Sequence, residues 1–323
     1  MSHVVRAIHI YQMSKGRNVL FYTRQDYLVL FTVISVCAKK HGIRLLGLAI
    51  MYNHLHILIE ECEPLSVSRF VADYSIKFAK LYNGELGCRG QVFHHPFGSA
   101  LKYGEKNIRT AAGYLYNNHT NKKLCSRAED IRWNFLAYAH NSNPFSEPLV
   151  LRRSSKSLRN AVKLVGLEHA AERPLSYSIL RRAFKKLTPP EKEQLIDRII
   201  VLYNIIDYAS LEGLYRSYED MLYSFNANTF NEYDISEEEE ERKGDDRVYI
   251  RLSKETLSSG RFENLKEILL IPDDQRLRLA VELRASTGIS YKCIGAFLHL
   301  RITRVKNVIS GDEARLIDEA YGH

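Results

Sequence analysis

Hydrophobic and polar positions repeat with two different periods along the first 145 residues. A period of two predicts strands, and a period of three to four predicts helices. Strands are expected at residues 4–13, 43–50 and 54–60 and within 84–104, and helices at residues 26–40 and 66–83. A further helix is expected from Asn107 to Lys123, with Asn107 as its N-cap. The order β-α-β-β-α-β is that of an α+β, ferredoxin-like domain, here followed by an extra helix.

Helical spacing continues through the rest of the chain, with one interruption. Residues 175–187 and 191–208 are the clearest helices between positions 146 and 230. Residues 231–246 then hold nine acidic and two basic side chains, and five adjacent glutamates repel one another too strongly to pack. Four regions are therefore predicted: the α+β domain over 1–145, a helical region over 146–230, an acidic linker over 231–246 and a compact domain over 247–323.

The last region combines a short helix, a tight turn and a second helix. Helices are predicted at residues 274–287, 291–298 and 301–310, with the turn at His299 and Leu300. The final helix carries outward-pointing basic and polar side chains, namely Arg301, Thr303, Arg304, Lys306 and Asn307. This pattern is typical of a helix-turn-helix DNA-binding domain, whose second helix enters the major groove. A helical hairpin with a solvated charged face would give the same pattern.

Two histidines distinguish the predicted strand 54–60. Successive side chains on a strand point to opposite faces, so His54 and His56 share one face of the sheet. Two neutral imidazoles side by side on a rigid strand offer half of a divalent-metal site. The exposed face of an amphipathic strand could show the same alternation, and spacing alone does not decide between the two.

The extra helix can supply a further ligand. Tyr114 and Asn118 are one turn apart on the same helical face, so Asn118 could add an amide oxygen while Tyr114 directs its hydroxyl toward the metal. Tyr116 lies roughly 200° further round the helix, so the two tyrosines cannot both face the metal. Because the chain contains 20 tyrosines, composition alone does not single out Tyr114.

Composition narrows the class of partner and the compartment. The chain has a net charge of +8, and residues 231–246 contribute −7, so the rest of the chain carries about +15. This excess of positive charge favours nucleic acid as a partner, although basic surfaces also serve solubility. Five scattered cysteines without a Cys-x-x-Cys pair fit neither a zinc ribbon nor a disulfide framework. The N-terminus lacks the apolar core of a signal peptide, and the longest apolar run, residues 28–38, is too short to span a bilayer. We therefore expect a cytoplasmic protein without membrane contact.

The histidine strand and the tyrosine motif together resemble a known family. Residues 52–56, Tyr-Asn-His-Leu-His, and residues 113–118, Gly-Tyr-Leu-Tyr-Asn-Asn, follow the pattern of single-tyrosine HUH transposases. Among these, the chain is similar to the REP-associated tyrosine transposases of bacteria. The similarity covers about residues 3–140, and its most specific part is the His-hydrophobic-His strand followed by Tyr-x-x-x-Asn.

The resemblance implies a reaction, a metal and a substrate. His54, His56 and Asn118 would hold Mg²⁺ or Mn²⁺, and Tyr114 would attack a phosphodiester of single-stranded DNA, often near a hairpin. The products would be a 5′-phosphotyrosine and a free 3′-hydroxyl, and rejoining would need no nucleotide triphosphate. Dimerisation is expected from the family, so we expect a homodimer, in which Tyr114 could serve the histidines of the second chain.

The sequence also departs from the family pattern. Tyr52 stands where a Pro usually precedes the Asn-His pair, and His119 stands where a Pro usually follows the tyrosine motif. Residues 95–99, His-Pro-Phe-Gly-Ser, replace a basic run of the Arg-Phe-Lys-Ser type, which removes charges that would contact DNA. Candidate substitute contacts are His94, His95 and His119, and candidate base-stacking residues are Tyr82, Phe93 and Phe97, although each is more often a surface or core residue.

Two other functions are compatible with these residues. A retired transposase could bind DNA as a regulator without cutting it, which the altered segment 95–99 favours. A replication-initiator or relaxase-type nuclease would share the chemistry but usually has a larger catalytic domain. The intact set of His54, His56, Tyr114 and Asn118 favours a DNA strand transferase instead.

Overall fold

A four-stranded antiparallel sheet with the order β2-β3-β1-β4 forms the centre of the N-terminal part. The computed structural model describes residues 4–227 and 246–321, with the side chains of the last helix described as far as residue 311. The strands are β1 (Arg6–Met13), β2 (Leu45–Ile50), β3 (His54–Glu60) and β4 (Gly98–Tyr103). Helices α1 (Arg24–Lys40) and α2 (Pro64–Leu86) complete the predicted β-α-β-β-α-β order, which is therefore confirmed.

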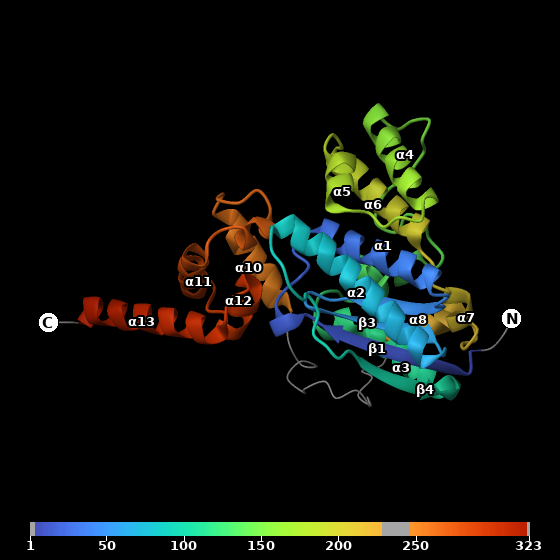
Figure 1. The fold of residues 1–323 in the computed structure, drawn as a ribbon, viewed down its shortest axis with the longest axis horizontal. Helices are drawn as coiled ribbons and strands as arrows, with labels where there is room; N and C mark the ends of the chain where they lie inside the picture. Colours follow the sequence, from blue (N-terminus) through green and yellow to red (C-terminus); the bar gives the residue numbers. More distant parts are fainter. Residues whose placement is uncertain (1–3, 228–245, 322–323) are drawn as a thin grey trace.

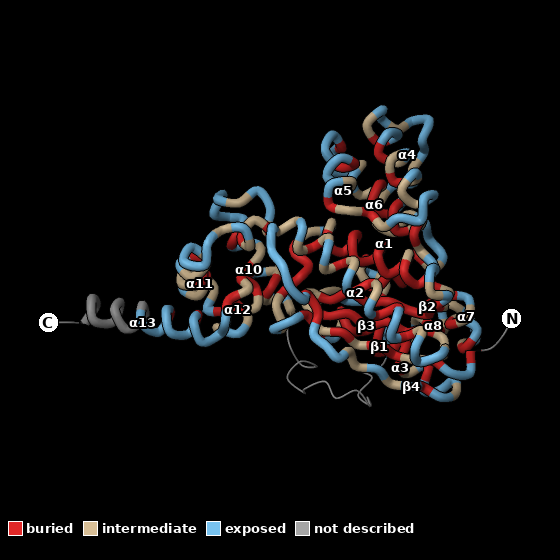
Figure 2. The backbone as a smooth tube through the Cα atoms, in the orientation of Figure 1, coloured by how far each residue is buried: buried red, intermediate tan, exposed pale blue. Residues whose placement is uncertain are grey.

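Helices cover both faces of this sheet (Figure 1). Because strand side chains alternate, Leu55 and Ile57 of β3 pack into one core with α1 and α2. Leu58 of the same strand packs on the opposite face into a second core with α3 (Gly104–Asn121). Figure 2 shows that the sheet and the inner sides of these helices are buried. The histidine face of β3 is therefore the face that α3 covers.

The start of α3 differs from the prediction. Asn107 is not the N-cap, because the helix already begins at Gly104 and its N-cap is Tyr103. The Asn107 side chain donates a hydrogen bond to the Tyr103 carbonyl oxygen (2.9 Å) and caps no backbone N–H. Glu105 in the first turn stabilises this earlier start through the helix dipole.

The middle region is helical, as its periodicity predicts. Its helices are α4 (Lys156–Ala170), α5 (Tyr177–Phe184), α6 (Pro189–Tyr203), α7 (Tyr208–Glu212) and α8 (Tyr218–Ala227). Helices α4, α5 and α6 form a lobe above α1 in Figure 1, whereas the Phe225 ring of α8 stacks on Tyr116 of α3 (5.1 Å between centroids). Helix α6 ends at Tyr203 rather than at Tyr208, because Ile206 forms a parallel bridge with Leu45 of β2.

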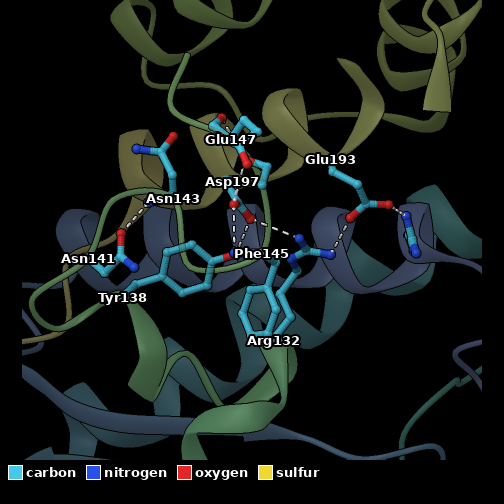
Figure 3. Close-up of polar contacts among 10 residues, drawn as sticks. Arg132, Tyr138, Asn141, Asn143, Phe145, Glu147, Glu193 and Asp197 are labelled. Carbon is cyan, nitrogen blue, oxygen red and sulfur yellow. Dashed lines mark hydrogen bonds and ion pairs between the residues drawn. The ribbon is translucent and has the colours of Figure 1, made fainter. Parts of the chain in front are cut away.

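Short 3₁₀ helices connect these elements: η1 (Lys15–Arg17), η2 (Ala128–Asp130), η3 (Arg132–Asn134), η4 (Leu136–Tyr138) and η5 (Leu265–Leu269). A buried carboxylate ties two of them to the lobe (Figure 3). Asp197 of α6 accepts hydrogen bonds from Arg132 Nη2 (2.9 Å), the Tyr138 hydroxyl (2.7 Å) and the Phe145 amide (3.1 Å). Arg132 also pairs with Glu193 (2.9 Å), so the lobe is held to the sheet domain by a desolvated polar network.

The C-terminal part contains α10 (Arg247–Ser258), α11 (Asp273–Thr287), α12 (Tyr291–Leu298) and α13 (Ile302–Tyr321). The predicted short helix, turn and second helix are present, although α13 extends beyond the predicted residue 310. His299 takes a left-handed conformation (φ 55°) that reverses the chain. A Cβ at Gly295 would lie 3.0 Å from the Leu300 carbonyl oxygen, so a larger residue there would force the turn to shift by a few tenths of an ångström.

The C-terminal helices pack against the N-terminal domain. The Tyr22 hydroxyl donates to the Phe297 carbonyl (2.5 Å), Lys266 Nζ lies 2.5 Å from Asp26 Oδ1, and the Tyr52 and Tyr249 rings lie 5.4 Å apart. Except for its last position, the predicted acidic linker (231–246) lies outside the described residues. No helix in the described ranges is both long enough and apolar enough to cross a membrane.

Candidate active site

His54 and His56 lie on the face of β3 that α3 covers, and both are buried. Their ring centroids are 5.2 Å apart. The Tyr114 ring of α3 stands edge-on to His56, with 5.3 Å between centroids. One chain therefore brings the predicted nucleophile to its own histidine pair.

Asn118 lies one turn after Tyr114 and is also buried. Its amide nitrogen donates to the Tyr114 carbonyl (3.3 Å), so the amide oxygen is the atom it would offer to a metal. The Tyr116 hydroxyl points elsewhere, since it donates to the Leu46 carbonyl (3.4 Å) on β2. Tyr114 and Tyr116 therefore point in different directions, as the helical spacing predicts.

Two aromatic residues of β1 at this site were not predicted from the sequence. His9 Nε2 lies 3.1 Å from His56 Nδ1, and the His9 ring stands edge-on to Tyr114 (5.8 Å between centroids). Tyr11 packs against both predicted ligands, with its ring centroid 5.6 Å from that of His54 and 5.1 Å from that of His56. Strand pairing explains both contacts, because Tyr11 is the register partner of His56.

Hydrogen bonds fix the orientation of the two candidate ligands. The Nδ1 atom of His54 lies 2.7 Å from Asn53 Oδ1, and the Nδ1 atom of His56 lies 3.1 Å from His9 Nε2. With Nδ1 engaged in each ring, Nε2 is the nitrogen that would bind a metal. Metal-binding histidines in proteins are commonly oriented by such a bond from their other nitrogen.

Burial keeps these imidazoles neutral. Burial, with a contribution from the charge of Lys122, lowers the pKa of His54 to about 3. Burial also lowers the pKa of His56 well below its ordinary value, and it lowers that of His9 to about 3 with help from Lys102. A neutral imidazole is the form that binds a metal. The positive charges of Lys102 and Lys122 also favour an anionic ligand beside the histidines.

The residues present fit a divalent metal in one specific way. Among the described residues, no three His, Cys, Asp or Glu side chains converge on a common point that could hold a metal. A carboxylate-rich site is thus absent from the described ranges. The donor set would be two neutral imidazoles, from His54 and His56, and the amide oxygen of Asn118, a mixture of nitrogen and oxygen donors.

The structure also places several auxiliary candidates. His119 is buried, and its Nε2 donates to the Ile50 carbonyl (3.1 Å), so it is no surface contact. Tyr82 and Phe93 are 2% and 1% exposed and belong to the core with α1 and α2, so neither can stack on a base. His94 and His95 are exposed.

The polar side chains predicted for DNA contact are exposed on α13 and at its start. They are Arg301, Thr303, Arg304, Lys306 and Asn307. Val305 and Ile309 of the same helix are buried in the C-terminal core, so the helix is amphipathic. Arg304 pairs with Asp273 at the start of α11 (2.7 Å).

The fold and the site define a mixed α/β protein whose candidate centre combines two strand histidines with a tyrosine of the covering helix. Residues 4–118 match the family model described as "Transposase IS200 like". This match includes β1 to β4, the histidine pair, Tyr114 and Asn118, and it confirms the resemblance for this part of the chain. The N-terminal part is therefore similar to IS200-like transposases over residues 4–118.

One solved structure is similar to this chain at low identity. It is described as the structure of a REP-associated tyrosine transposase bound to a REP hairpin. The identity is 14% and the TM-score 0.34, and the similarity covers 42% of this chain and 79% of the other. No curated protein matches the chain.

Proposed function

We propose that this chain is a metal-dependent transposase that cuts and rejoins single-stranded DNA through Tyr114. The observation that carries the proposal is the placement of His54 beside His56 on one buried face of the sheet, with Tyr114 of the helix that covers this face in contact with His56. The IS200-like family match over the same residues supports it.

The proposed reaction is a transesterification at phosphorus. The Tyr114 oxygen attacks the phosphorus atom in line, a bond from tyrosine oxygen to phosphorus forms, and the bond to the 3′ oxygen breaks. The phenol gives up its proton, and the departing 3′ oxygen takes one up. Attack by another 3′-hydroxyl reverses these steps and restores Tyr114, so the energy of the phosphodiester is conserved.

Mg²⁺ or Mn²⁺, held by His54, His56 and Asn118, would act as a Lewis acid toward a non-bridging phosphate oxygen. Lys102 and Lys122 are buried cations whose charges act on these histidines, and we assign them the neutralisation of the phosphodiester. Tyr114 is only 5% exposed, so access of DNA to its oxygen requires movement of the surrounding side chains.

The direct test is a covalent adduct with DNA. The full chain is incubated with a 3′-labelled library of single-stranded oligonucleotides, with Mn²⁺ or with EDTA. We expect a denaturant-resistant protein–DNA species only with Mn²⁺, and a phosphotyrosine at residue 114 by mass spectrometry. Adducts that form equally in EDTA would exclude the metal, and a different modified residue would exclude Tyr114.

We assign His9 the role of a positioning residue, since its Nε2 is the partner of His56 Nδ1. His9→Leu is expected to weaken Mn²⁺ binding about 10- to 100-fold, the usual cost of removing such a partner. His9→Gln can place an amide oxygen near the position of the imidazole nitrogen and should restore most of the affinity. Titration calorimetry with Mn²⁺, without DNA, measures both variants. Equal affinities in the wild type and His9→Leu would mean that His9 only fills space.

We propose further that α11 to α13 form a helix-turn-helix domain that binds DNA through the exposed face of α13. Lys306→Ala should weaken binding of all DNA sequences similarly and reduce the salt dependence by about one unit of slope. Asn307→Ala should reduce discrimination of the target sequence by about 1–3 kcal/mol. Fluorescence anisotropy at several salt concentrations measures both, with Lys254→Ala on α10 as a matched control. A change in Lys254→Ala as large as that in Lys306→Ala would refute the assignment.

The proposed substrate is single-stranded DNA near a hairpin, and the proposed assembly is a homodimer. Light scattering on the purified chain measures the assembly. The contact of Tyr114 with His56 of its own chain supports a site that works within one subunit. Mixing a Tyr114→Phe chain with a His56→Ala chain tests this, because recovered cleavage would require a site shared between chains.

A DNA-binding regulator without cleavage is the second candidate. The buried position of Tyr114 favours it. This function would give tight DNA binding and no covalent adduct with any metal.

A further inference from the structure

Two exposed segments of the lobe carry only positive charge. Residues 151–163 contain five basic side chains and residues 181–186 contain four, and neither segment contains an acidic one. All nine are exposed. They lie on or directly beside α4 and α5, which pack against each other, so the charges accumulate on one helix pair.

The acidic side chains nearby are engaged elsewhere. Glu168 and Glu172 are the only two between positions 150 and 190. Glu168 pairs with Arg173 (2.8 Å) and Glu172 with Lys39 of α1 (2.6 Å). Arg181 pairs with Glu85 of α2. Among the described residues, no ion pair includes any of the other eight basic side chains, so most of the positive charge of the two segments is not paired with a carboxylate.

A groove of about 300 Å³ lies between the two helices. Its polar lining consists of Ser157 and Asn160 of α4, Arg182 of α5, and Lys185 and Lys186 just after α5. Among the ion pairs of the described residues, none includes Lys185 or Lys186. Hydroxyl, amide, guanidinium and ammonium groups together are the donors that proteins use toward phosphate and sugar oxygens.

None of the described residues that line this groove is aromatic. The groove therefore lacks the ring surfaces on which unpaired bases stack. Its chemistry fits the sugar-phosphate backbone and carries no means of reading the bases.

We propose that the α4–α5 groove is a second DNA-binding surface, which holds the backbone of the substrate DNA away from the point of cleavage. This rests on the proposed function, because that function identifies the polyanion as DNA. The lobe stands on the α1 side of the sheet, whereas the histidines face α3 (Figure 1). The groove thus contacts DNA that flanks the segment bound at Tyr114.

The lobe presents this groove rigidly. The buried Asp197 network fixes α6 to the sheet domain, and α6 packs against both α1 and α4 (Figure 3). A preformed surface loses little conformational entropy when it binds, so its charges contribute fully to affinity.

The test compares two doubly charge-reversed full-length proteins. Lys185→Glu with Lys186→Glu alters the groove, and Lys80→Glu with Arg198→Glu makes the same change in net charge at exposed positions of α2 and α6. Anisotropy is measured with a short single strand and with a hairpin of about 20 base pairs that carries the same strand as a tail, at several salt concentrations. Thermal unfolding of both variants checks that they fold.

We expect the groove variant to bind the hairpin roughly 10- to 100-fold more weakly. The slope of log affinity against log salt concentration should become shallower by about one unit for each phosphate that is left without a basic partner. The short strand should bind both variants equally. This inference alone would be overturned if a folded groove variant bound the hairpin with unchanged affinity and salt slope while the wild type still formed the Tyr114 adduct. Absence of both adduct and DNA binding in the wild type would overturn the proposed function as well. If the groove variant bound phosphatidylserine vesicles more weakly than the control variant did, while both bound DNA equally, the groove would be assigned to membranes.

Discussion

Tyr114→Phe is expected to abolish the covalent DNA adduct. Removing a covalent nucleophile lowers turnover by roughly 10⁵-fold or more, which is below detection in an adduct assay. The ring remains, so its edge-on contacts with His9 and His56 and its packing in the buried site are kept. Folding and DNA affinity should therefore be close to those of the wild type.

Tyr116→Phe provides a matched control on the same helix. It removes a hydroxyl that forms one long hydrogen bond, to Leu46 (3.4 Å), and it leaves the stacking on Phe225 intact. We expect this variant to form the adduct at nearly the wild-type rate. An adduct that persists in Tyr114→Phe and disappears in Tyr116→Phe would move the nucleophile to the other tyrosine.

The candidate site was predictable where it depends on local spacing. His54 and His56 share a face because a strand has a period of two, and Tyr114 and Asn118 share a face because a helix has a turn of 3.6 residues. The prediction that these two pairs meet came from the resemblance to a family, because spacing along the chain does not show which distant elements lie together. The family match over residues 4–118 confirms that resemblance, and the contact of His56 with Tyr114 is what the structure adds to it.

His9 could not be placed from one sequence. It lies in a strand of alternating Ile and polar residues, and only the register of β1 against β3 brings it to His56. A shift by one residue would point it to the opposite face, and no turn joins these two strands to fix their register. The sequence shows only that His9 and Tyr11, two positions apart on one strand, share a face of the sheet.

Tertiary contacts also decided the ends of elements. Helix α6 continues in the sequence pattern to residue 208, but Asp207 donates its backbone N–H to Leu45 (2.8 Å) and draws the chain to β2. Such a contact between residues far apart in sequence outweighs helix propensity.

Two departures from the family pattern have structural roles. Tyr52 packs against Tyr249 of α10, so the residue in place of the usual Pro joins the sheet domain to the C-terminal helices. His119 donates to Ile50 at the end of β2, where a Pro could not. These substitutions fit a chain whose N-terminal domain is packed against additional helices.

Asp197→Ala is expected to have the largest effect on stability. The carboxylate is fully buried and accepts hydrogen bonds from Arg132, Tyr138 and the Phe145 amide. Its removal leaves the buried Arg132 guanidinium with the Tyr138 hydroxyl (3.0 Å) and with Glu193, which is partly exposed. Breaking a buried pair from one side costs about 3–5 kcal/mol. Urea unfolding should show a lower midpoint, and the lobe should lose its attachment to the sheet domain first.

Glu168→Ala is the matched control, because it removes a carboxylate from an ion pair near the surface. Its partner Arg173 is largely exposed, so the loss should be no more than about 1 kcal/mol. Replacing both members of the buried pair, Arg132→Met with Asp197→Leu, should be less destabilising than Asp197→Ala alone, because no charge is then left buried without its partner. If Asp197→Ala costs no more than Glu168→Ala, the network does not hold the lobe, and the rigid presentation of the α4–α5 groove loses its support.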